Sequence, residues 1–527
     1  MLIWIILWSS ACILAYGNAQ MMADREEKGR SITQLRIWEV KMKRPVFNGR
    51  EVLLVNHYLT VWYLRRCTAV RKINRKRQNS EIDLKKMLWP IFFELIMTGI
   101  IGNINQMILN EFSPIAVAST TAASQFLTLT NNMYTIFSVG QSILVALAWG
   151  AGNDREGVRI LLSSLFANLC FSIVLSLTGT ALIPNVTVWL NMPMELRQMG
   201  ADYLKVMISC SVFQAMTVTL SAALRAMGKM KEVMLGNLLI NGSCVGMNFL
   251  ILICVPEQVQ VVGMYALAGV FSQIFGGVFF YAVLRADKRA GRLIGRGGIS
   301  LKEFKAGLWN NVRHIIRLGF PGGMEGIIYL ISQTAVMSLI GILGTQALTV
   351  KGYTGNLVTY MALPANAVPL AAATLIGMAA GQHRSDRIHE VFNRCLKISL
   401  ILTGLICAVC LLGGRVFLMV YTKDSEILNQ CMRILVIDCI LELSRCFAAL
   451  LVVGLKGVGD VRLPFIMVII ASGLNIGISW YFGIVLGFGL PGIWYGYVAD
   501  LVFRSIIGMY RWNNYRKNRD YPIWNET

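Results

Sequence analysis

Charged residues, histidines and catalytic motifs are all scarce in this chain of 527 residues. Asp, Glu, Lys and Arg make up 15% of it, whereas soluble domains hold about 25%. The four histidines come without an H-E-x-x-H pair, and neither a G-x-S-x-G nor a P-loop motif is present. The twelve cysteines lie mainly inside apolar segments, as is typical of small buried side chains. The sequence therefore predicts no enzyme, no cofactor and no metal site.

Long hydrophobic runs, by contrast, fill most of the chain. Hydrophobic residues make up 55% of it, and the mean hydropathy is +0.58. A helix needs about 20 apolar residues to cross a bilayer, and its backbone groups must bond within the segment. We therefore expect an all-α polytopic membrane protein with twelve transmembrane helices, near residues 87–109, 115–148, 158–184, 199–224, 233–255, 262–284, 315–343, 346–380, 396–421, 428–454, 463–486 and 490–510.

The net charge of +21 would suggest a nucleic-acid partner on a soluble protein, but its distribution indicates a membrane. Every second connection between the expected helices is basic. These connections and the two flanking segments hold 38 Lys or Arg, whereas the alternate connections hold two, Arg197 and Lys423. Such a bias orients membrane proteins with the basic side in the cytoplasm. We expect both ends of the twelve-helix core to be cytoplasmic, with membrane lipid and no nucleic acid as partner.

The basic extension at 1–83 allows several interpretations. Residues 1–17 are apolar but have no positively charged start, so they could be an extra helix, a signal segment or sequence upstream of the true start. Residues 51–66 are too short and polar to span a bilayer, and their basic flanks favour a helix at the membrane surface.

The rest of the chain is a duplication. ALRAMGKMKEVML from residue 223 matches GLKGVGDVRLPFI from residue 454 at an offset of 231. Repeats of this kind are typical of secondary transporters, in which the substrate path lies between the halves. We expect two six-helix lobes related by a pseudo-twofold axis along the membrane normal, at 84–286 and 315–513, with a basic linker at 287–314 and a cytoplasmic tail at 514–527.

An acid follows a proline by four residues at matching places in the two lobes: Glu94 after Pro90, and Glu325 after Pro321. A carboxylate in hydrocarbon costs about 2.5–3.5 kcal/mol on insertion scales. Each acid could cap its helix near the interface or take part in ion coupling.

The deeper charges all belong to the second lobe. Asp438, Glu442 and Arg445 are spaced i, i+4, i+7 in the tenth span, so they share one helix face. The equivalent first-lobe residues, Met207, Ser211 and Gln214, are uncharged. Two acids beside one arginine predict surplus negative charge, where a proton or sodium ion would bind; the alternative is a static lattice of ion pairs.

The twelfth span adds Asp500 and Arg504 at i, i+4, with the same two interpretations. Glu325 lies in this charged lobe, so we expect it to act with the acids of the tenth helix. Glu94 has no deep cation in its own lobe on this interpretation, so we expect it to be mainly structural.

The repeated turns, the GAGNDREG turn after the second helix and GFPGGMEG opening the second half together resemble the multidrug and toxic compound extrusion (MATE) family. The resemblance covers about 84–513. It implies a polyspecific, monomeric exporter that exchanges small organic cations for protons or sodium ions by alternating access, without a cofactor. Many bacterial members carry an aspartate late in the first helix, and here the matching position is Asn105. An amide cannot take up and release a proton near neutral pH, although it could bind a polar substrate or sodium.

Two rivals remain. A lipid-linked oligosaccharide flippase shares the architecture, but it should show a cationic cavity for pyrophosphate, whereas the expected surplus here is acidic. A membrane-embedded enzyme would need a nucleophile–base pair or a metal cluster, and no such motif is present.

Overall fold

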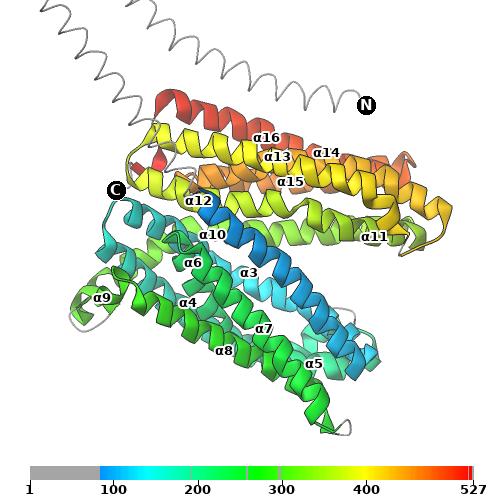
Figure 1. Ribbon diagram of the computed structural model, residues 1–527, viewed down its shortest axis with the longest axis horizontal. Coiled ribbons are helices and arrows are strands. Elements are labelled where there is room, and N and C mark those ends of the chain that lie inside the picture. Colours follow the sequence, from blue (N-terminus) through cyan, green and yellow to red (C-terminus); the bar gives the residue numbers. More distant parts are fainter. Residues whose placement is uncertain are drawn as a thin grey trace, which may run out of the picture. The chain divides into compact units, whose positions relative to one another are not determined.

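The computed structural model describes residues 84–189, 192–256, 259–294, 298–419, 421–519 and 521–524. The extension at 1–83, with its apolar start and the expected surface helix at 51–66, lies outside these residues. Within them every regular element is a helix and no strand occurs (Figure 1). The all-α class is therefore confirmed.

The first lobe is a bundle of six spans. Its fourth span consists of two helices, which meet at Cys210 with a bend of 54°. The helices α4, α6, α7 and α8 lie alongside one another in Figure 1 and pack in contact. The bundle comprises Leu84–Phe112, α3 (Pro114–Gly150), α4 (Asp154–Trp189), α5 (Met194–Ser209), α6 (Ser211–Ala226), α7 (Met230–Cys254) and α8 (Val262–Ala286).

The second lobe repeats this plan. Its second span is divided between α11 and α12, with the break at Ala362, just before Pro364, whose ring cannot occupy a helix interior without removing a backbone hydrogen bond. After α9 (Ala290–Ile294) the lobe comprises α10 (Leu301–Ile342), α11 (Thr345–Met361), α12 (Leu363–Gly381), α13 (Ser385–Leu418), α14 (Ser425–Gly457), α15 (Arg462–Trp480) with η2 (Tyr481–Val485), and α16 (Gly489–Asn518), and η3 (Pro522–Trp524) follows.

Length and hydropathy single out nine membrane-spanning candidates in the described part of the chain, or ten when α5 and α6 are one span. The long helices α14 and α16 are not among them, since each carries several charged residues. With these two included, the architecture agrees with the expected twelve spans in two bundles.

The lobes meet along α3 of the first and α10 and α12 of the second. Glycines let the backbones approach: a Cβ at Gly140 would collide with the carbonyl oxygen of Ile315, and one at Gly319 with that of Ile136. Gly150 lies as close to Met378. All these contacts are toward the end of the molecule where α3 and α12 finish and α10 begins, so the lobes are joined at the basic end.

α10 starts within the segment expected to be the linker. Ser300 caps it, and Glu303 completes a capping box by accepting a hydrogen bond from the Ser300 N–H. Glu303 also pairs with Arg155 of α4 at 2.8 Å. Part of the linker is therefore a helical extension of the seventh span that contacts the first lobe.

Candidate functional site

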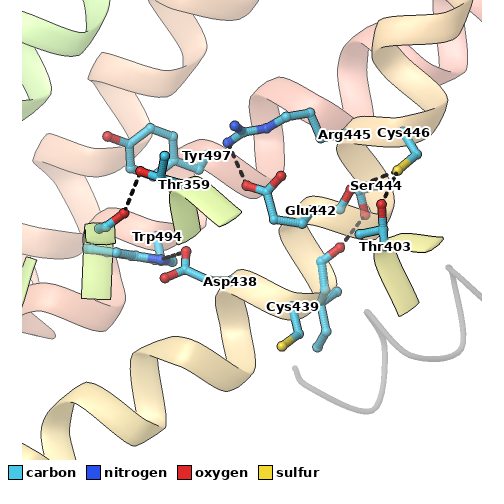
Figure 2. Close-up of polar contacts among 12 residues, drawn as sticks. Thr359, Thr403, Asp438, Cys439, Glu442, Ser444, Arg445, Cys446, Trp494 and Tyr497 are labelled. Carbon is cyan, nitrogen blue, oxygen red and sulfur yellow. Dashed lines mark hydrogen bonds and ion pairs between the residues drawn. The ribbon is translucent and has the colours of Figure 1, made fainter. Parts of the chain in front are cut away.

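The charged face of α14 lies in the middle of that helix and is buried. Asp438 is 5% exposed and Glu442 is 1% exposed. Arg445 Nη2 lies 3.1 Å from Glu442 Oε1, as expected from their shared face (Figure 2). One helix therefore brings two acids and one cation together inside the second lobe.

Trp494 of α16 fixes the position of Asp438. Its indole N–H donates a hydrogen bond of 2.7 Å to Asp438 Oδ1, and the ring is fully buried (Figure 2). The second oxygens, Asp438 Oδ2 and Glu442 Oε2, are buried and have no hydrogen-bond partner among the described residues. Such atoms usually find a partner in native proteins, so each has room to bind a water molecule, a proton, an ion or a polar ligand.

The sequence interpretation missed Lys351 of α11. Its Nζ lies 4.8 Å from the ring centroid of Trp494 and 5.5 Å from that of Tyr497. Its charge is attracted by Asp438 and Glu442 and repelled by Arg445. The predicted surplus of negative charge is thus wrong: two acids are matched by two cations. The sequence does contain a signal for this residue. Lys351 lies inside an apolar span, and the equivalent residue of the first lobe, 231 positions earlier, is the uncharged Thr120.

Asp500 and Arg504 of α16 form their own pair. Arg504 Nη2 and Nε lie 2.7 and 2.8 Å from Asp500 Oδ1. One turn earlier, the Tyr497 hydroxyl donates to Gln333 Oε1 of α10 at 3.1 Å. This arrangement fits the lattice alternative for these two residues and ties α16 to α10.

Glu94 and Glu325 each pair with a cation at the end of a helix. Glu94 Oε1 accepts hydrogen bonds from Arg225 Nη2 at 2.5 Å and from Asn237 Nδ2 at 2.6 Å. Glu325 pairs with Lys456 near the end of α14. In both lobes the acid and its cation are 131 residues apart. Glu94 was expected to have no deep cation in its lobe; the cation that it does contact, Arg225, lies in the last turn of α6.

Glu325 does not contact the charged face of α14. Lys456 lies 14 residues beyond Glu442, which is about 21 Å along a helix. Glu325 is thus paired near the end of α14, and its joint action with the acids in the middle of that helix stays a prediction.

Uncharged side chains occupy the corresponding depth of the first lobe. Ser211 accepts a hydrogen bond of 2.8 Å from the Tyr134 hydroxyl, and Gln214 donates one of 3.3 Å to Asn131. Asn105 Oδ1 accepts from Asn248 Nδ2 at 2.6 Å. Within the described ranges, no group of three or more His, Cys, Asp or Glu could hold a metal ion.

A family model, MatE, matches residues 90–251 and 321–481. The matches start 231 residues apart, which is the offset of the repeat, and together cover more than half of the chain. The chain belongs to the MATE family. Its charged site is carried by the second of the two MATE repeats.

Two relatives and a solved structure match the chain over most of its length. YisQ of Bacillus subtilis, named an uncharacterized transporter, is 26% identical over 84% of this chain and 96% of its own length. NorM of Thermotoga maritima, named a probable multidrug resistance protein, is 23% identical over 81% and 90%. A solved outward-facing conformation of a multidrug resistance MATE family transporter superposes with a TM-score of 0.72 at 17% identity, over 82% of this chain and 95% of that one.

Proposed function

We propose that this MATE protein is a secondary active exporter that exchanges organic cations for protons or sodium ions. The observation that carries the proposal is the pair of buried carboxylates, Asp438 and Glu442, each with one oxygen unpartnered among the described residues. Asp438 accepts a hydrogen bond from Trp494, and the faces of Trp494 and Tyr497, which already hold the ammonium group of Lys351, attract cations. Multidrug resistance in the names of relatives is consistent with such a substrate class.

Alternating access fits the way the lobes pack. The contacts at Gly140, Gly150 and Gly319 close the basic end of the molecule. If the basic end lies in the cytoplasm, as its charge favours, the lobes are closed toward the cytoplasm in this state. Exposing the site to the cytoplasm then requires these contacts to separate.

The test is transport into inverted membrane vesicles that contain the full chain, with ethidium as the fluorescent cation. An acidic lumen or a sodium-loaded lumen is imposed in turn. We expect one gradient to drive uptake, and we expect Glu442→Gln to abolish it. Glu426→Gln, an exposed acid in the first turn of the same α14, is the matched control and should transport normally. Failure of both gradients to move the cation would overturn the proposal.

A flippase for lipid-linked pyrophosphates is the second candidate. Three cations lie in this part of the lobe: Lys351, Arg445 and Arg504. They favour binding of a pyrophosphate more than the acidic surplus expected from the sequence did. Inorganic pyrophosphate should then raise the thermal stability of the purified protein, and ethidium should not.

A further inference from the structure

Lys351 breaks the symmetry of the molecule at a position where the first lobe has no charge. It lies in the first half of α11, and the residue 231 positions earlier is Thr120 of α3. A lysine within a membrane span needs a partner or access to water, since its charge is costly in hydrocarbon. Its surroundings therefore indicate what the side chain does.

The ammonium group rests on two aromatic faces. Trp494 and Tyr497 belong to α16 and lie 4.8 and 5.5 Å from Nζ, within the range of about 6 Å over which cation–π attraction acts. The Trp494 indole also donates its N–H to Asp438. A carboxylate that accepts this hydrogen bond polarises the ring and makes its face more attractive to a cation. This is the kind of aromatic surface that recognises organic ammonium ligands.

Charges from two neighbouring helices surround Lys351. α14 contributes Asp438, Glu442 and Arg445, which all act on the lysine. On α16 the acid Asp500 is already paired with Arg504. Without a ligand, Lys351 and Arg445 balance Asp438 and Glu442. The lysine thus supplies the positive charge that a bound cation would otherwise supply.

Lys351 is half-buried and is held loosely. In the part of the chain that the structure describes, its Nζ makes no hydrogen bond and no ion pair within 4.0 Å. Gly355 lies one turn further along α11, and a Cβ there would meet nothing within 4 Å. The helix face one turn beyond the lysine is therefore open, and the contacts that its ammonium group must break when it moves are those with the two rings.

We propose that Lys351 is a tethered cation that occupies the organic-cation site of this transporter and competes with the substrate for it. A substrate cation binds against Asp438, Trp494 and Tyr497 by displacing the lysine. When the substrate leaves, the ammonium group returns and restores neutrality. The inference rests on the proposed function and identifies what limits the affinity of the protein for its cationic substrate.

The test measures binding of tetraphenylphosphonium to the purified full chain by calorimetry. Lys351→Met removes the charge but keeps the length of the side chain. We expect its Kd to fall about tenfold or more, because one positive charge has left a site with low dielectric constant. Lys351→Arg keeps the charge and should bind with an affinity close to that of the parent. Lys205→Met, an exposed lysine on α5, is the matched control and should change nothing.

One further readout and one further variant keep the test decisive. In Lys351→Met, sodium ions should compete with the probe, whereas in the parent protein they should not, beyond the effect of potassium at equal ionic strength. If Lys351→Met does not fold, Lys351→Gln replaces it with the same expected direction.

The outcomes separate the two proposals. If the parent binds the probe but neither neutral variant binds it more tightly, Lys351 is not a competitor, and cation export still stands. If the neutral variants bind more weakly, the lysine helps to hold the ligand, and the inference is overturned. If neither the parent nor any variant binds or transports a cation, the proposed function itself fails.

Discussion

Glu325 on α10 pairs with Lys456 at the end of α14, and not with the charged face in the middle of that helix. The first lobe repeats the arrangement with Glu94 and Arg225. Each pair joins the first helix of a lobe to the end of its fourth span. Because both lobes keep it, the pair belongs to the shared framework of the lobes, whereas the charges at Asp438 and Glu442 occur in one lobe alone.

We expect Glu94→Gln and Glu325→Gln to have similar effects, because each leaves one mostly buried cation without its acid. The free energy of unfolding should fall by about 1–3 kcal/mol in each case. Neutralising the partner as well, in Glu325→Gln/Lys456→Met, should restore part of the loss. Thermal unfolding in detergent and ethidium transport at equal expression measure both effects. A large loss for Glu325→Gln together with none for Glu94→Gln would instead favour a coupling role for Glu325.

Neutralising Asp438 should impair transport as Glu442→Gln does. We expect Asp438→Asn to lower the initial rate of ethidium uptake about tenfold or more, because it removes a full negative charge from the cation site. The Trp494 indole can still donate to the remaining carbonyl oxygen, so the packing of α14 against α16 should persist. Unchanged thermal stability combined with the parental transport rate would exclude Asp438 from the site.

The sequence predicted most of the fold because membrane spans leave a strong local signal. Each span needs about 20 apolar residues, and the repeat at an offset of 231 residues shows which helices of the two lobes correspond. Breaks inside a span are a weaker signal. The bend at Cys210 has no proline or glycine beside it, so no residue pattern indicates that the fourth span is two helices.

The site was predicted only where its residues share a helix. Spacing alone placed Asp438, Glu442 and Arg445 on one face, and the structure agrees. Partners on other helices depend on packing, which periodicity does not reveal. Trp494 and Lys351 were missed for this reason. Arg225 and Lys456 stood in the motifs that revealed the repeat, but only the folded lobes bring them to Glu94 and Glu325.

Asn105→Asp should be tolerated and should make transport depend more strongly on a proton gradient. Asn105 Oδ1 already accepts a hydrogen bond from Asn248, and a carboxylate oxygen can accept the same bond. The new acid adds a group that takes up and releases a proton, which the amide cannot do. The measurement is ethidium uptake as a function of lumen pH, at equal expression. An unchanged pH profile would count against the prediction.

Gly140→Val should loosen the contact between the lobes. A Cβ at Gly140 would collide with the backbone of α10 at Ile315 and would lie 3.0 Å from the Gly319 nitrogen, and backbone cannot move aside as a side chain can. Overpacking of this kind costs about 1–3 kcal/mol, so the midpoint of thermal unfolding should fall. Transport should slow as well, because the substitution destabilises the conformation in which the basic end of the molecule is closed.

Gly99→Val is the matched control for this change. It places the same branched residue at a helical glycine, so the change in helix propensity is equal, but a Cβ there meets nothing within 4 Å. We therefore expect Gly99→Val to retain nearly the parental stability and transport rate. Equal effects of the two substitutions would mean that helix propensity, and not the approach of α3 to α10, decides the outcome, and the role of this contact in closing the basic end would have to be abandoned.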